Sequence, residues 1–238
     1  WSPPQRRPLL HPRGRHYRNA TSAGNSIASS SAEWSGEQMY KAYGSRGSRI
    51  SRVLWMLEEL NENYEFVPIK LRSAEAYALN PSGKVPILVD GDFKIADSAA
   101  ICTYLADKHA EKGMGANPGL FGRAEIDSWM HFAQSEFEAP LWNKLRHRFL
   151  LPEALRVDVG PATAYDFGNE VKALEGRLAG RDYALGERFS AVDVTLGDMG
   201  AWARAGKFRI DSDIVNVYLD RVLARPARER SQRAGGGF

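Results

Sequence analysis

The first part of the chain alternates strand-like and helix-like patterns. MYKAY and YEFVPI, at 39–43 and 64–69, are short apolar runs with the length of strands. The segment between them repeats its apolar residues at i, i+3, i+4 and i+7, which is typical of one helical face: Val53, Met56, Leu57 and Leu60. This order predicts a strand, a helix and a second strand.

A hairpin and another helix follow this unit. Asp90-Gly91 separates two strand-like runs, 85–90 and 92–96, and this dipeptide favours a two-residue turn that needs positive φ. A helical pattern then covers 98–111. The complete order, βαβββα, predicts an α/β thioredoxin-like domain with a mixed sheet over 39–112.

The rest of the chain is patterned as helices. Residues 113–122 contain Gly and Pro, and we interpret them as a linker to an all-α domain over 123–229. Ser190 and Asp193 have the spacing of a capping box, so we assign both to folding. Helical patterns begin at 123 and recur at 162–179, 190–205 and 213–224.

Both ends of the chain lack periodicity. Residues 1–38 are rich in Arg, Ser, Pro and Gly, which predicts a disordered extension, and we expect residues 230–238 to be a frayed tail. The composition of the extension also fits an organelle transit peptide. We expect an upstream extension or a gene-prediction artefact instead, because the chain begins with Trp and a Met stands at position 39.

The distribution of charge argues against a nucleic-acid partner. The formal net charge of +3 arises in residues 1–38, which contain five arginines and two glutamates, and the remainder of the chain has no net charge. No apolar run approaches the ~20 residues that a membrane-spanning helix needs, so we expect no membrane partner either.

Cys102 is the single cysteine, so an intrachain disulfide is impossible and a reducing, cytoplasmic location is the simplest assignment. A Cys-x-x-Cys redox motif is absent from the sequence. We expect Cys102 to be a small buried filler within its helix. Any thiol chemistry must therefore come from a bound thiol.

The segment NPSGKVPILVDGDFKIADSAAI, 80–101, carries the strongest chemical signal. Pro86 stands at the first position of a strand, where its missing N–H costs the ladder little. Ser98 can cap the following helix, and the free N–H groups at a helix start suit a carboxylate. Asp97 beside them suits an ammonium. The segment therefore predicts a site for a small anionic peptide.

A Val-Pro before a hairpin and an acidic-Ser pair followed by Ala-Ile resemble the glutathione-binding half of the glutathione S-transferase family. The resemblance extends over about 39–229 and is to bacterial-type, serine-type soluble members. It implies a cytoplasmic homodimer that uses glutathione and a small hydrophobic electrophile, with no metal cofactor. It also implies a cis bond between Val85 and Pro86 and an extended glutathione paired with the backbone of Val85.

The same resemblance assigns the remaining glutathione contacts. Lys84 lies near the glycyl end, and Arg72 can reach the glycyl carboxylate. The γ-glutamyl group is held by Asp97 and Ser98. The second substrate lies against the helical domain, where Phe132 is the leading candidate, followed by Trp129 and Trp142, although plain packing is an open alternative for each.

Three serines compete to activate the thiol: Ser45, Ser48 and Ser51. A thiol of pKa ~8.5 is only about 3% ionised at pH 7, and lowering the pKa to roughly 6.5 requires about 2.7 kcal/mol. One hydroxyl hydrogen bond to a charged group contributes roughly 1.5–3 kcal/mol. Serine-type relatives place the hydroxyl a few residues before an Arg-Val pair, so we favour Ser48, then Ser45. A tyrosine-type arrangement through Tyr43 is less favoured, because Tyr43 falls within the strand.

Several basic residues leave alternatives open. Arg46, Arg49 and Arg52 crowd one helix start, where cations oppose the macrodipole. They either face an anionic ligand or form a solvated face. KLRHRF, 144–149, lacks partners with metal-ligand spacing, and we interpret it as a pocket rim or a subunit interface.

The leading function is a glutathione transferase. A glutathione-dependent disulfide or peroxide reductase, and a non-catalytic interaction module on the same fold, are the alternatives.

Overall fold

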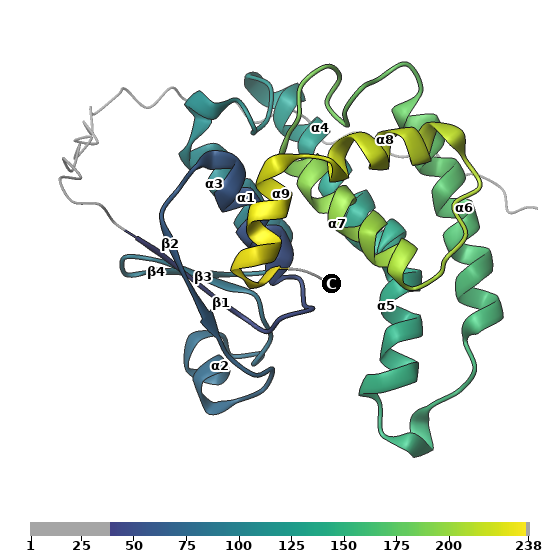
Figure 1. Cartoon of the computed structure of the whole chain (residues 1–238), viewed down its shortest axis with the longest axis horizontal. Coiled ribbons are helices and arrows are strands. Elements are labelled where there is room, and N and C mark those ends of the chain that lie inside the picture. Colours follow the sequence, from purple (N-terminus) through teal and green to yellow (C-terminus); the bar gives the residue numbers. More distant parts are fainter. Residues whose placement is uncertain (1–38, 237–238) are drawn as a thin grey trace, which may run out of the picture. The chain divides into compact units, whose positions relative to one another are not determined.

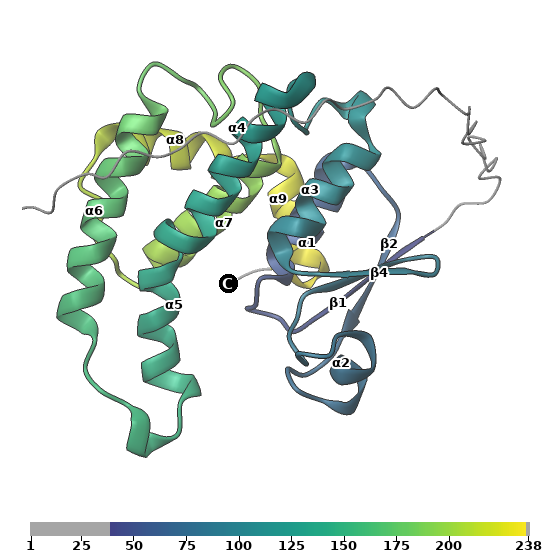
Figure 2. The ribbon, with the colours of Figure 1, turned by 180° about the vertical axis from the view of Figure 1, so that it is seen from behind.

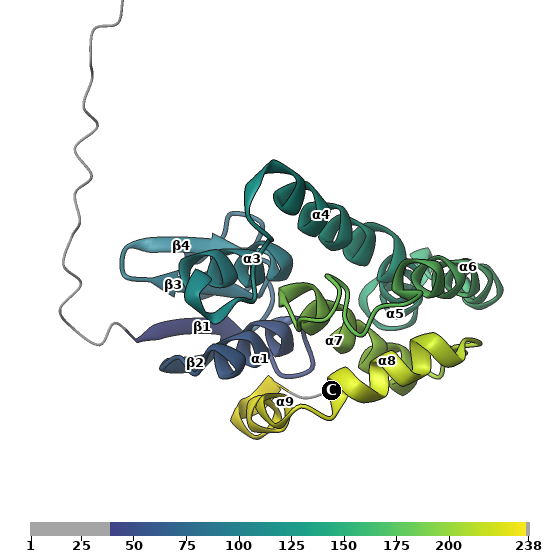
Figure 3. The ribbon, with the colours of Figure 1, turned by 90° about the horizontal axis from the view of Figure 1, so that it is seen from above.

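The computed structural model describes residues 39–236, and the predicted disordered extension, 1–38, lies outside them. The first domain contains a four-stranded sheet in the order β2-β1-β3-β4, which Figure 1 and Figure 3 show from two directions. β1 pairs parallel with β2 and antiparallel with β3, and β3 pairs antiparallel with β4. The predicted mixed, thioredoxin-like sheet is therefore confirmed. The strands are β1 (Tyr40–Gly44), β2 (Tyr64–Pro68), β3 (Ile87–Asp90) and β4 (Phe93–Ala96).

The helix α1 (Ile50–Leu60) connects the two parallel strands and is buried on more than one face. Its predicted apolar stripe is fully buried. Leu54 and Trp55 lie off that stripe and are also buried, because helices of the second domain pack against the opposite side of α1. The first domain is completed by α2 (Ala74–Leu79), α3 (Ser98–Lys108) and the short η1 (Ala110–Lys112).

The hairpin turn lies one residue later than predicted. Asp90 pairs with Phe93 across the hairpin, so the two loop residues are Gly91 and Asp92. Gly91 has a φ of 59°, and Asp92 is not among the residues with positive φ. Because only the first loop position needs positive φ, the turn resembles type II′ rather than the expected type I′.

The second domain is all helical, and its first helix begins earlier than predicted. α4 (Gly119–His131) takes its first turn from the predicted linker, 113–122. Gly122 lies against the carbonyl of Asn117, where an added Cβ would be 1.9 Å from the oxygen. Here glycine marks close packing at a helix start rather than a flexible connection.

The other helices of this domain follow in sequence order. In Figure 2, α5 and α6 run beside each other, and the chain between them forms the far end of the domain. The elements are η2 (Phe132–Phe137), α5 (Ala139–Leu145), η3 (Arg146–Leu150), η4 (Glu153–Leu155), α6 (Gly160–Leu178), α7 (Ala191–Ala205) and α8 (Asp213–Leu223). No helix within residues 39–236 combines the length and apolarity that a bilayer span requires.

The predicted capping box at the start of α7 is present. Asp193 Oδ2 accepts hydrogen bonds from the backbone N and the Oγ of Ser190, at 2.8 and 2.7 Å. Its other oxygen, Oδ1, accepts from the Tyr218 hydroxyl at 2.9 Å. Both members of the box are fully buried, which supports the structural role assigned to them.

The predicted fraying of residues 230–238 is wrong for 230–236. α9 (Pro226–Ser231) and η5 (Gln232–Gly236) pack against α1, between the sheet and α7 in Figure 1. Arg225 forms two hydrogen bonds with Glu59, at 2.6 and 2.7 Å, and Arg230 Nε lies 2.7 Å from Glu58 Oε2. The tail is held by ion pairs rather than by an apolar stripe, so periodicity gives no signal for it.

Candidate active site

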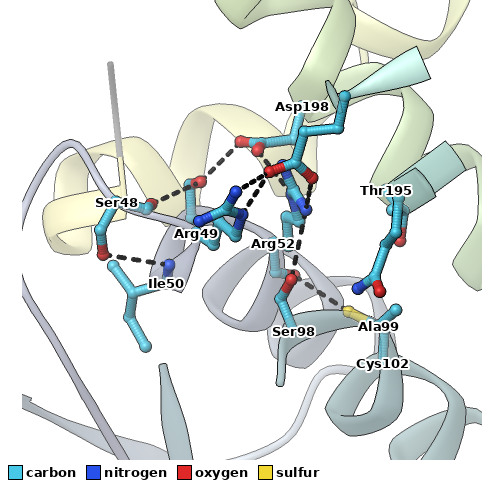
Figure 4. Close-up of polar contacts among 12 residues, drawn as sticks. Ser48, Arg49, Ile50, Arg52, Ser98, Ala99, Cys102, Thr195 and Asp198 are labelled. Carbon is cyan, nitrogen blue, oxygen red and sulfur yellow. Dashed lines mark hydrogen bonds and ion pairs between the residues drawn. The ribbon is translucent and has the colours of Figure 1, made fainter. Parts of the chain in front are cut away.

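Arg52, in the first turn of α1, has a buried guanidinium that forms hydrogen bonds with residues of three other segments. Its Nε donates to Asp198 Oδ2 of α7 at 2.8 Å, and its Nη1 donates to Glu138 Oε2 at 2.8 Å. Nη1 also lies 3.2 Å from Ser98 Oγ at the start of α3 (Figure 4). Burial opposes the charge, but the two carboxylates more than offset it, so the pKa of Arg52 is raised. Arg52 therefore connects the domains internally and belongs to neither alternative left open for the arginines.

Arg49 binds the same carboxylate as Arg52, that of Glu138. Its guanidinium makes an ion pair with Glu138 Oε1. The same group lies 4.7 Å from the ring centroid of Trp142 and 5.9 Å from that of Trp202. Arg46 is exposed and forms no ion pair with a described residue. The three arginines of this helix start therefore have three different environments.

Arg49, Arg52, Glu138 and Asp198 form an ion cluster. A hydrogen bond to this cluster distinguishes Ser51 from the other two serines. Ser51 is buried, and its Oγ donates to Asp198 Oδ1 at 2.6 Å. Ser48 Oγ instead lies 3.4 Å from the backbone N of Ile50, from which it accepts a hydrogen bond. A hydroxyl that accepts from the backbone keeps its own proton available as a donor. Ser51 is thus occupied by the fold, whereas Ser48 can still donate.

Ser45 and Ser48 line a cleft of about 500 Å³ that is shared by both domains. Tyr43 lies within β1 and does not line it. No aspartate or glutamate is among the lining residues. The first domain contributes Ser45, Gly47, Ser48, Arg49, Leu71, Arg72, Lys84 and Val85. The helical domain contributes Trp142, Leu145, Arg146, Leu150, Leu151, Pro152 and Trp202.

The loop before β3 brings backbone groups to this cleft. The Val85–Pro86 peptide bond is cis, as the resemblance implied, and Pro86 is buried. Val85 precedes the strand, and no turn or loop hydrogen bond among residues 39–236 uses its backbone. The side chain of Asn80 donates to the carbonyl of Lys84 at 2.9 Å, which fixes the loop. The backbone of Val85 is therefore held in place with its polar groups unpaired by the loop.

Asp97 and Ser98 lie at the start of α3 and outside the lining of the cleft. Asp97, rather than Ser98, caps the helix: its Oδ1 accepts from the backbone N of Ala99 and Ala100, at 3.0 and 3.2 Å. The Oδ1 also accepts from Gln134 Nε2 of the helical domain at 2.9 Å. Ser98 is the first residue of α3 and not its cap. It is buried, and its Oγ accepts a hydrogen bond from Arg52 Nη1.

The three predicted aromatic residues are not brought together. Trp142 lines the cleft, but Phe132 and Trp129 do not. Phe132 is 7% exposed and Trp129 is 4% exposed, and their rings pack against each other with centroids 6.4 Å apart. The cleft instead receives Trp202 from α7, which sequence reasoning missed because the apolar face of α7 reads as ordinary core.

Cys102 is buried behind α1, and its thiol lies 3.7 Å from the carbonyl oxygen of Arg52. Burial raises the pKa of this thiol to about 12. Because the thiolate is the reactive form, we expect no measurable reaction of the folded protein with an aromatic disulfide reagent at pH 8. The same reagent should titrate one thiol per chain after unfolding. Rapid labelling of the folded protein would contradict the burial of Cys102.

No group of three His, Cys, Asp or Glu side chains within residues 39–236 is arranged to hold a metal ion. The chemical groups in the cleft are hydroxyls, cations and indoles. They can bind an anionic peptide, stabilise an anion on its thiol and contact an apolar second molecule.

The chain is similar in sequence to known proteins of one family. Residues 42–113 match the family model of the glutathione S-transferase N-terminal domain. Glutathione S-transferase 3 of Zea mays is 29% identical over 207 residues, covering 82% of this chain and 93% of the maize protein. Glutathione S-transferase F6 of Arabidopsis thaliana is 32% identical over 168 residues, covering 65% of this chain and 78% of that protein.

The similarity extends to three-dimensional structure. The structure of a sphingomonad glutathione S-transferase complexed with glutathione aligns with a TM-score of 0.70 at 28% sequence identity. The alignment covers 82% of this chain and 98% of the sphingomonad chain, so it includes both domains. The chain belongs to the glutathione S-transferase family of enzymes.

Proposed function

We propose that the chain joins glutathione to a small apolar electrophile, and that the cleft at the N-terminus of α1 activates the glutathione thiol. One observation carries the proposal: Ser45, Ser48 and Val85 line the same cleft. A hydroxyl donor therefore lies near a backbone segment that can pair with an extended peptide. The sphingomonad relative, whose structure contains glutathione, supports the choice of peptide.

Ser48 is the proposed thiol-activating residue. Its hydroxyl accepts from the backbone of Ile50, so its proton can point to the sulfur of glutathione. One such hydrogen bond to a thiolate contributes roughly 1.5–3 kcal/mol. The positive end of the α1 macrodipole adds about 0.3–1 kcal/mol. Together they reach the stabilisation needed for a thiol pKa of roughly 6.5, without a general base.

Lys84 and Arg72 are proposed to bind the carboxylates of glutathione. Both side chains line the cleft and are exposed, and neither forms an ion pair within the described residues. Asp97 and Ser98 remain proposed contacts of the γ-glutamyl group, reached at the start of α3. The second substrate would lie against Trp142 on the helical side.

We expect Lys84→Met to raise the dissociation constant of glutathione about fivefold to tenfold, because it removes a charge-assisted hydrogen bond to a carboxylate. Titration calorimetry with glutathione measures this constant. Lys94→Met is the matched control, since Lys94 is an exposed lysine of β4 outside the cleft. Equal affinities for the two variants would remove Lys84 from the site.

A conjugation assay tests the proposed function itself. We expect the protein to form the glutathione conjugate of 1-chloro-2,4-dinitrobenzene faster than the buffer control. Tight glutathione binding without turnover of this or other electrophiles would favour the interaction-module alternative. Turnover confined to mixed disulfides or hydroperoxides would favour the reductase alternatives.

Two broader proposals rest on the family. We propose a homodimer, as the resemblance implies, and a cytoplasmic location, which the single buried cysteine supports.

A further inference from the structure

The cations of the cleft divide into two groups by domain. Arg72 and Lys84 come from the thioredoxin-like domain, as does Arg49, whose charge is paired with Glu138. Arg146 lies on the opposite, helical side, at the start of η3. If Arg72 and Lys84 bind glutathione, Arg146 remains as a positive charge in the part of the cleft left for the second substrate.

The charge of Arg146 is not neutralised by the protein. Its side chain is exposed, and it forms no ion pair with any residue in the described range 39–236. Arg49, which lines the cleft from the thioredoxin-like domain, differs because Glu138 binds it and two indoles flank it. The two arginines therefore have different roles: Arg49 is part of the wall, and Arg146 is free to bind an anion.

Apart from Arg146, the helical side of the cleft is apolar and aromatic. The other residues that line the cleft from the helical domain are Trp142, Leu145, Leu150, Leu151, Pro152 and Trp202. An indole and branched aliphatic side chains favour a planar, apolar body. A guanidinium at the edge of such a surface favours a carboxylate, which it can bind through two parallel hydrogen bonds.

We propose that the second substrate is an aromatic electrophile that carries a carboxylate, with its ring on the apolar wall and its carboxylate on Arg146. This inference rests on the proposed function and narrows its substrate class. In the transfer step, the glutathione sulfur forms a bond to the ring carbon, and the bond from that carbon to the leaving group breaks. The leaving group departs as an anion with the electron pair, the thiol proton passes to solvent, and the carboxylate is unchanged.

The test compares two substrates of the same ring. 4-Chloro-3,5-dinitrobenzoate and its methyl ester share the leaving group and differ in charge. For each substrate, the kcat/KM of Arg146→Gln is divided by that of the wild-type enzyme, which removes the intrinsic difference in reactivity. Arg148→Gln is the control, because Arg148 is an exposed arginine of the same segment that does not line the cleft.

We expect Arg146→Gln to lower kcat/KM about tenfold for the carboxylate, equivalent to about 1.4 kcal/mol, and less than about twofold for the ester. The KM for glutathione should stay within about twofold, and Arg148→Gln should change none of these values. Equal losses for both substrates, or no loss for the carboxylate, would overturn the inference while leaving the proposed function intact. Failure of the wild-type enzyme to conjugate either substrate would instead count against the proposed function, and the inference would fall with it.

Discussion

Replacing Arg52 with methionine is expected to lower the free energy of unfolding by about 3–5 kcal/mol, because it removes one partner of a buried ion cluster. Glu138 is 3% exposed and Asp198 is 5% exposed, so their carboxylates would remain buried with fewer donors. Methionine is long enough to fill part of the space, which limits the cavity contribution. The loss is a large fraction of the 5–15 kcal/mol that stabilises a typical domain. Urea denaturation followed by circular dichroism measures it.

The matched control is Arg204→Met. Arg204 also pairs with an aspartate, Asp220, at 2.7 Å, but that pair is on the surface. Exposed pairs contribute about 0–1 kcal/mol, so this variant should remain within about 1 kcal/mol of the wild type. If Arg52→Met were no less stable than Arg204→Met, the cluster would not be what holds α1 against α5 and α7.

The second large effect concerns the reaction. We expect Ser48→Ala to lower kcat/KM for glutathione about 10- to 100-fold at pH 6.5, the range that corresponds to a lost hydrogen bond to a thiolate. Without the hydroxyl, the pKa of the bound thiol rises toward ~8.5 and less thiolate is present at this pH. The deficit should therefore shrink above pH 9, where thiolate forms in both enzymes. Steady-state conjugation kinetics between pH 6 and pH 9.5 measure the effect.

Two further serine variants make this result specific. Ser135→Ala is the control, because Ser135 is exposed and bonds the carbonyl of His131 away from the cleft. Ser45→Ala examines the other serine of the cleft. If Ser45→Ala caused the larger, pH-dependent loss and Ser48→Ala did not, Ser45 would be the thiol-activating residue.

Hydrophobic periodicity and turn residues were sufficient to predict α1 and the strand order of the first domain. The stripe of α1 and the alternation of strands and turns depend on local spacing, which the sequence displays directly. The hairpin turn was misplaced by one residue because Asp90-Gly91 and Gly91-Asp92 are both plausible turn pairs. Only the pairing of Asp90 with Phe93 distinguishes them.

The ion cluster could not be predicted in the same way. The partners of Arg52 are Glu138, the residue before α5, and Asp198 of α7, both far along the chain. One signal was present: α1 carries large apolar residues, such as Leu54 and Trp55, outside its main stripe. A helix that is apolar on several faces is buried on several faces. An arginine within it therefore needs internal partners.

The candidate site was predicted where it depends on the loop chemistry of one segment. Lys84 and Val85 line the cleft and stand just before β3, so their placement follows from the local order of loop and strand. The second pocket depends on how two domains meet, and no local pattern encodes that contact. Among the residues that line the cleft, Trp142 was predicted from the sequence but Trp202 was missed. Phe132, the leading candidate, lies in the helical core.

The central claim is that this cleft lowers the pKa of the glutathione thiol. The most direct test is ultraviolet difference absorbance of the thiolate when glutathione is added to the full chain, titrated from pH 5 to pH 10 for the wild type and Ser48→Ala. We predict thiolate with an apparent pKa of roughly 6.5 in the wild type and close to ~8.5 in the variant. Because Cys102 is buried with a raised pKa, a signal in this range comes from glutathione. Glutathione that binds the wild type and remains a thiol up to pH 8 would contradict the claim.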